Sequence, residues 1–184
     1  PFCRRLRKEL AEYTGQKTEH ILCGNGGADL IYRLVYALRP KKALVTAPAF
    51  AEYEEALAQT GTEIVFHELG ESPVTKTFLE KLSPDLELVF LCNPNNPTGL
   101  LTEKALLREL LERSRKLGIR VLLDECFLDF VPEEKAYTAS DLLEEYPNLV
   151  ILKSFTKLFA IPGLRLGYAR CSDTELLSRM QRAG

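Results

Sequence analysis

The stretch that decides the fold is Ser154-Phe155-Thr156-Lys157-Leu158-Phe159-Ala160-Ile161-Pro162-Gly163-Leu164-Arg165-Leu166-Gly167-Tyr168. Lys157 lies between hydroxyl residues and an apolar run, and Arg165 follows eight positions later, after a Pro-Gly turn. An amine that acts as a nucleophile must be partly desolvated, which the apolar neighbours favour. Serine, threonine and arginine side chains are good phosphate ligands. A nucleophilic amine beside phosphate ligands indicates the chemistry of pyridoxal phosphate.

Outward from this stretch, short apolar segments alternate with helix-like segments about seven times. We expect strands over residues 21–23, 42–47, 62–66, 87–92, 119–123, 148–153 and 164–169. We expect helices over residues 2–13, 30–38, 49–59, 73–82 and 102–117, from 141 for a short length, and from 172 onward. The alternation predicts a three-layer α/β/α sandwich around a mostly parallel sheet, in which ligands lie at the carboxyl ends of the strands.

A glycine-rich turn, Gly24-Asn25-Gly26-Gly27-Ala28-Asp29, joins the first expected strand to a helix. Small residues and free N–H groups at the start of a helix form a geometry that binds phosphate. The turn matches neither GxxxxGK[ST] nor GxGxxG, so it does not carry these nucleotide-binding signatures. A purely structural strand-to-helix turn is an equal alternative at this point.

Three further candidates also follow expected strands. Phe50 would either stack on a ligand ring or pack in the core. The rigid turn Asn93-Pro94-Asn95-Asn96-Pro97-Thr98-Gly99 would hold Asn96 as a hydrogen-bond donor, and its Asn-Pro bonds are candidates for cis peptides. Asp124 ends a buried strand, so its carboxylate needs a cation or hydrogen-bond donors, unless it caps a helix.

Composition narrows the class of protein. The chain has 184 residues, enough for one domain, and its net charge of −2 gives no indication of a nucleic acid or an anionic membrane as partner. It has no run of eighteen apolar residues and no signal peptide, so we expect no membrane span. The five cysteines are dispersed, which favours free thiols in a reducing cytoplasm over disulfides or a metal site. Pro1 and the helix-like end at Gly184 are typical of a fragment.

Taken together, the turn over 93–99, Asp124, Ser154-x-x-Lys157 and Arg165 resemble the fold-type I pyridoxal-phosphate enzymes, the aspartate aminotransferase superfamily. The resemblance covers nearly the whole chain and implies that residues 1–184 are the large cofactor-binding domain, without the N-terminal segment and the C-terminal small domain. It implies that Lys157 forms the Schiff base and that Asp124 pairs with the pyridine nitrogen. The cofactor-binding residues that it implies are Gly27, Ala28, Phe50, Asn96, Asp124, Phe127, Ser154, Thr156, Lys157 and Arg165.

Two branches of the superfamily compete. The run over 156–168 and the run Phe50-Ala51-Glu52-Tyr53 are similar to the threonine-phosphate decarboxylases of cobalamin synthesis, and Phe127 stands where many aminotransferases have a tyrosine. This resemblance implies decarboxylation of O-phospho-L-threonine to aminopropanol phosphate. A histidinol-phosphate aminotransferase is the alternative, and a cofactor-binding fragment without turnover is a third. The resemblance further implies a small phosphorylated amino-acid substrate, a homodimer of the full-length protein, and a carboxylate-binding arginine beyond residue 184.

Overall fold

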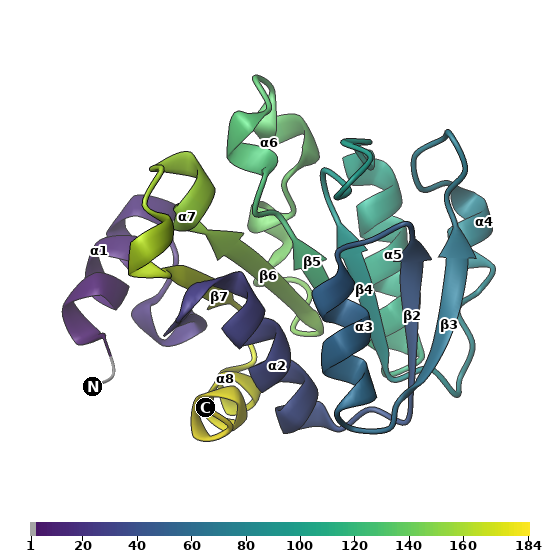
Figure 1. Cartoon of the computed structure of the whole chain (residues 1–184), viewed down its shortest axis with the longest axis horizontal. Helices are drawn as coiled ribbons and strands as arrows, with labels where there is room; N and C mark the ends of the chain where they lie inside the picture. Colours follow the sequence, from purple (N-terminus) through teal and green to yellow (C-terminus); the bar gives the residue numbers. More distant parts are fainter. Residues whose placement is uncertain (1–2) are drawn as a thin grey trace.

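A seven-stranded sheet forms the centre of the computed structural model, which describes residues 3–184 (Figure 1). Its strands are β1 (Ile21–Gly24), β2 (Lys42–Ala47), β3 (Glu63–Glu68), β4 (Leu88–Cys92), β5 (Arg120–Asp124), β6 (Leu149–Ser154) and β7 (Gly167–Arg170). Their order across the sheet is β1-β7-β6-β5-β4-β2-β3. Strands β2 to β6 are parallel to one another, whereas β7 is antiparallel to both of its neighbours.

Helices cover both faces of the sheet. They are α1 (Arg4–Thr14), α2 (Gly26–Leu38), α3 (Ala51–Ala58), α4 (Lys76–Leu79), α5 (Lys104–Lys116), α6 (Glu134–Tyr137), α7 (Phe155–Leu158) and α8 (Thr174–Arg182). Short 3-10 turns lie at Thr18–His20, Leu128–Phe130, Ser140–Leu142 and Pro162–Leu164. Helices α2, α3 and α8 pack on one face, and α4 and α5 pack on the other (Figure 1). The predicted three-layer, mostly parallel α/β fold is confirmed.

The alternation of side chains along β4 shows how one strand supplies two cores. Leu88 and Phe90 point toward α2 and α3, whereas Val89 and Leu91 point toward α5. Successive side chains of a strand point to opposite faces, so an unbroken apolar run is what a strand covered on both sides requires. Burying each such side chain contributes roughly 1.5–3 kcal/mol before the entropy of ordering is subtracted.

The reversal of β7 positions Arg165. Parallel strands β4, β5 and β6 end at one edge of the sheet, and β7 begins at that edge because it is antiparallel to β6. Arg165 lies just before β7, so it reaches the same edge from the opposite chain direction. The one candidate that does not follow a strand end therefore still lies beside the others.

Several sequence expectations are wrong at element boundaries. The strand expected over 164–169 begins only at Gly167, because Pro162–Leu164 form a 3-10 turn. The helix expected over 73–82 shortens to Lys76–Leu79, since Thr75 is still extended at φ −123° and ψ −175°. The helix expected over 2–13 starts at Arg4 within the described residues, and Phe2 lies outside them.

The rigid turn after β4 forms as predicted, and Thr102, the expected start of the next helix, is bonded to this turn. Asn93-Pro94 and Asn96-Pro97 are both cis, and Gly99 has φ 73°. The buried Asn93 side chain accepts a hydrogen bond from the Thr102 N–H at 2.8 Å. Thr102 thus anchors the turn, and Glu103, not Thr102, occupies the N-cap position of α5. Within residues 3–184, no helix combines the length and the apolar composition that a membrane crossing needs.

Candidate active site

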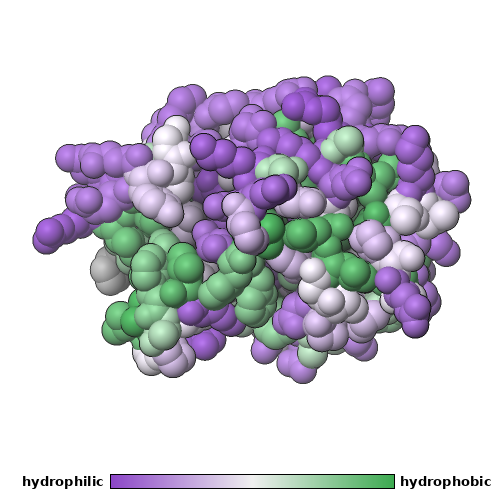
Figure 2. Space-filling model, turned by 90° about the horizontal axis from the view of Figure 1, so that it is seen from above, coloured by the Kyte–Doolittle hydropathy of each residue, from purple (hydrophilic) through white to green (hydrophobic). Residues whose placement is uncertain are grey.

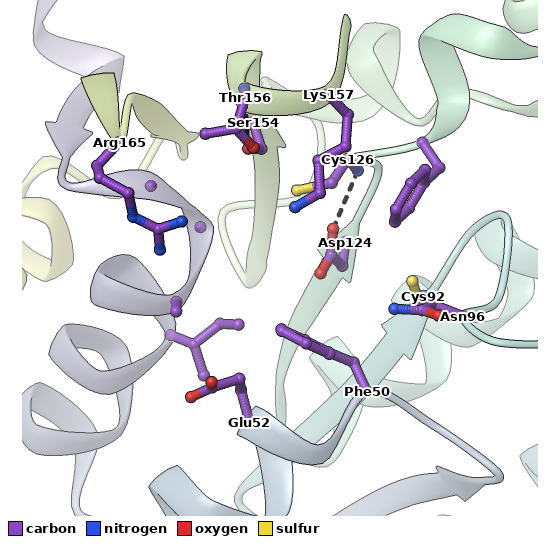
Figure 3. Close-up of a pocket in the computed structure, with 15 residues that line it drawn as sticks. Phe50, Glu52, Cys92, Asn96, Asp124, Cys126, Ser154, Thr156, Lys157 and Arg165 are labelled. Atoms are coloured by element: carbon purple, nitrogen blue, oxygen red, sulfur yellow. Dashed lines mark hydrogen bonds between the residues drawn. The ribbon is translucent and has the colours of Figure 1, made fainter. Parts of the chain in front are cut away.

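A cavity of about 320 Å³ opens at the edge of the sheet where β4, β5 and β6 end (Figure 3). All ten residues singled out from the sequence line it: Gly27, Ala28, Phe50, Asn96, Asp124, Phe127, Ser154, Thr156, Lys157 and Arg165. They come from the starts of α2 and α3, the turn after β4, the ends of β5 and β6, α7 and the segment before β7. The chain thus brings together side chains more than a hundred positions apart.

One end of the cavity can accept an anion. Helix α2 begins at Gly26, and the Asn25 side chain does not cap it, which leaves the first N–H groups of α2 for a ligand. Arg165 extends toward the same end of the cavity as Ser154 and Thr156 (Figure 3). The hydroxyl oxygens of Ser154 and Thr156 lie 2.8 Å apart. These donors form a set suited to a phosphate group.

The close approach of the α2 start to the sheet requires glycine. A Cβ on Gly167 would lie 2.7 Å from the carbonyl carbon of Gly26 and 2.9 Å from the nitrogen of Gly27. A Cβ on Gly26, which has φ 85°, would meet the Arg165 guanidinium at 3.4 Å. The glycines of the sequence therefore let the helix start, the strand and the arginine converge on one point.

Lys157 and Asp124 lie at the middle of the cavity. Lys157 extends from α7 into the cavity, toward the side that carries Asp124 and Cys126 (Figure 3). Its Nζ lies 5.6 Å from the centre of the Phe127 ring, a distance at which the aromatic face attracts a cation. The amine thus has an apolar wall on one side and a carboxylate across the cavity.

Two donors fix the Asp124 carboxylate, which is 5% exposed. The Tyr53 hydroxyl donates to Oδ2 at 2.7 Å, and the backbone N–H of Cys126 donates to Oδ1 at 3.0 Å. The carboxylate therefore has hydrogen-bond donors, one of the two kinds of partner expected from the sequence, and Asp124 also lines the cavity.

Sequence reasoning missed five residues of the cavity wall: Gly26, Ile31, Glu52, Cys92 and Cys126. The thiols of Cys92 and Cys126 are buried, and desolvation raises the pKa of both well above its usual value, so they remain protonated. They close the cavity floor as small apolar groups. Cys126 stands two residues after Asp124, a spacing that returns a side chain to the same side of an extended chain and could have indicated it.

The residues present fit pyridoxal phosphate. Phosphate ligands lie at one end, a lysine and a carboxylate face each other across the middle, and the rings of Phe50 and Phe127 flank the space. Binding of this cofactor requires each of these groups: an anion site for its phosphate, an amine, a partner for its ring nitrogen, and apolar walls for its ring. Fold and site together define a pyridoxal-phosphate-dependent enzyme domain.

Comparison with known proteins places this domain in a family. The sequence profile of the family described as aminotransferase class I and II matches residues 3–184. The chain is 43% identical over 180 residues to "Threonine-phosphate decarboxylase" of Salmonella typhimurium, covering 96% of this chain and 49% of the relative. It is 34% identical over 176 residues to "Histidinol-phosphate aminotransferase 2" of Archaeoglobus fulgidus, covering 91% and 47%. The chain belongs to the aminotransferase class I and II family, whose members depend on pyridoxal phosphate.

A solved structure agrees. The crystal structure of L-threonine-O-3-phosphate decarboxylase from Porphyromonas gingivalis superposes with a TM-score of 0.86 at 29% identity, covering 99% of this chain and 53% of that one. The chain thus spans about half the length of the relatives that it matches.

Proposed function

We propose that the protein removes CO2 from O-phospho-L-threonine, with pyridoxal phosphate as cofactor, and yields aminopropanol phosphate. The observation that carries this proposal is the 43% identity with a threonine-phosphate decarboxylase, over a stretch that contains the whole cavity wall. Phe127 beside Lys157 supports it, because many aminotransferases of the superfamily have a tyrosine there. When bound, the cofactor withdraws electrons from the α-carbon of an amino acid.

Five residues at the phosphate end of the cavity have a role in binding the cofactor phosphate. The N–H groups of Gly27 and Ala28 point from the start of α2, where the helix dipole favours negative charge. Ser154 and Thr156 contribute hydroxyl donors, and Arg165 contributes a guanidinium that matches phosphate geometry. In this proposal these groups hold the phosphate and so fix the position of the cofactor.

The ring end of the cavity gives the other five residues their roles. Lys157 binds the cofactor covalently through Nζ and moves a proton at the substrate α-carbon. Asp124, whose carboxylate is held in place by two donors, would keep the ring nitrogen protonated through its negative charge. Phe50 and Phe127, which line the cavity, would exclude water from the ring, and Asn96 would donate a hydrogen bond to its phenolic oxygen.

Incubation of the full-length protein with O-phospho-L-threonine and cofactor tests the proposal. We expect CO2 release, and we expect a Lys157→Ala variant to lose it by several orders of magnitude while keeping its fold. Histidinol phosphate with 2-oxoglutarate is the second arm. Amino transfer in that arm, with no CO2 from O-phospho-L-threonine, would replace the proposal with the second candidate, an aminotransferase, which the 34% identity with a histidinol-phosphate aminotransferase favours.

A protein that binds the cofactor without turnover is the third candidate. Borohydride reduction followed by peptide mass mapping distinguishes it. An adduct on Lys157 with neither CO2 release nor amino transfer would support this candidate, whereas an unlabelled Lys157 would exclude all three.

The assembly and the domain boundary belong to the same proposal. We infer that residues 1–184 are the cofactor-binding large domain of a cytoplasmic homodimer. Hydrophobic residues gather on the face that contains the ends of the parallel strands (Figure 2), and Tyr13, Phe159 and Leu164 are 75%, 57% and 71% exposed. Exposed apolar surface of this kind is typical of interfaces. Sedimentation of the full-length protein at two concentrations measures its oligomeric state.

A further inference from the structure

Tyr53 lies directly behind the cavity, although it is not part of the cavity wall. It is 1% exposed, and its ring is held between two other aromatic rings. Phe90 of β4 stacks on it at 4.9 Å and 17°, and Phe50 meets it edge-on at 5.7 Å and 89°. A ring that is packed on both sides holds its hydroxyl in one place. That place is 2.7 Å from Asp124 Oδ2.

This hydroxyl is a permanent donor. Burial, together with the charge of Asp124, raises the pKa of Tyr53 well above its ordinary value, so the phenol keeps its proton near neutral pH. Asp124 Oδ1 is held by a backbone N–H, which no side-chain substitution removes. The Tyr53 hydroxyl is therefore the side-chain group that fixes the rotation of the carboxylate about its last bond.

The same residue connects two walls of the cavity. Tyr53 contacts Phe50, which lines the cavity and lies three positions earlier in the chain, and it donates to Asp124, 71 positions later. A shift of the Phe50 ring would therefore move the donor on Asp124. A buried tyrosine that had only to satisfy its hydroxyl could have used a backbone carbonyl, whereas here it uses the carboxylate that faces the cavity.

We propose that Tyr53 is a positioning residue, which acts through Asp124 to set the orientation and the negative charge that this carboxylate presents to the cofactor ring nitrogen. This inference rests on the proposed role of Asp124. Two consequences follow for a Tyr53→Phe variant. The carboxylate loses its fixed orientation, so cofactor affinity falls. With one donor gone, the negative charge of the carboxylate is also less offset, so it acts more strongly on the bound cofactor and stabilises its protonated forms.

The experiment measures both consequences on the full-length protein. Pyridoxal phosphate is titrated into the wild type and into Tyr53→Phe, and the absorption band of the bound cofactor is followed against pH. We expect affinity to fall about tenfold and the pH midpoint of the band to rise by about 0.5 unit in the variant. Tyr146→Phe is the matched control. Tyr146 is 2% exposed, does not line the cavity and packs in the core on the α5 side of the sheet, so we expect loss of its hydroxyl to change stability while leaving both cofactor readouts unchanged.

A double-mutant cycle separates action through Asp124 from a general packing effect. In an Asp124→Ala background we expect Tyr53→Phe to leave cofactor affinity unchanged. An unchanged affinity and midpoint in Tyr53→Phe alone would overturn the inference, and so would an equal loss of affinity in the Asp124→Ala background. A wild type that binds no pyridoxal phosphate would instead overturn the proposed function, and this inference with it.

Discussion

The absence of a side chain at Gly167 lets the start of α2 pack against the sheet at the phosphate end of the cavity. Gly167 pairs with Gly24 on one side and Ser154 on the other, directly beneath the start of α2. The contact is backbone against backbone, at 2.7 Å from the position a Cβ would take. Neither partner can move aside as a flexible side chain would, so the cost of any side chain falls on the helix start itself.

A Gly167→Ala substitution should therefore displace the start of α2. We expect a loss of about 1–3 kcal/mol of stability in urea unfolding, together with a clear loss of pyridoxal phosphate affinity. Gly163→Ala is the control, since a Cβ there meets nothing within 4 Å, and it should change neither quantity. Equal behaviour of the two variants would contradict the steric account.

At the scale of elements, helix α8 depends on Asp173 at its N-cap. The carboxylate accepts from the N–H of Leu176 at 3.0 Å and from the Arg120 guanidinium at 2.5 Å. Burial by itself raises the pKa of Asp173, but these donors outweigh it and hold the pKa below its ordinary value. A carboxyl group with a lowered pKa in the folded state stabilises the fold above its unfolded pKa, and this stabilisation is lost as the pH falls.

The Asp173→Asn variant should lack this pH-dependent stabilisation. At pH 7 we expect the wild type to be more stable by about 1 kcal/mol, because asparagine still caps the helix but loses the charge that pairs with Arg120. The difference should shrink as the pH falls from 5 toward 3. Urea unfolding followed by circular dichroism at each pH measures it, and a difference that grows on acidification would contradict the assignment.

The elements also show what the sequence could and could not predict. Asn96, Asp124 and Lys157 line one cavity, as expected of residues that each follow the end of an apolar segment, because parallel strands align their ends. The direction of β7 could not be predicted, because the apolar pattern of a short strand is the same in both directions. The hydrogen bond from Tyr53 to Asp124 joins residues 71 positions apart, so no local sequence pattern could predict it.

At the scale of the whole molecule, the five cysteines differ in how far they are buried. Cys3 is exposed and Cys23 is partly buried, whereas Cys92, Cys126 and Cys171 are buried. Burial raises the pKa of Cys23 and of Cys171 to about 11, so little of either thiol ionises near neutral pH. Since the thiolate is the reactive form, low exposure and a raised pKa both reduce the reactivity of a thiol.

Alkylation with iodoacetamide should follow that order. We expect Cys3 to react first, Cys23 more slowly, and the three buried thiols only when the protein unfolds. Mass mapping after timed quenching measures each site, and a sample in denaturant should show all five cysteines modified. Early modification of Cys92 or Cys126 in the native protein would contradict the closed floor of the cavity.

The place of β1 at the edge of the sheet, beside β7, has a consequence for synthesis on the ribosome. Residues 21–24 emerge before their pairing partner, residues 167–170, which is made about 140 residues later. At ordinary elongation rates the interval is on the order of ten seconds. During this time the glycine turn has no strand to rest against, so the phosphate end of the cavity closes only when β7 inserts between β1 and β6. The phosphate end of the cavity is therefore incomplete until β7 has inserted.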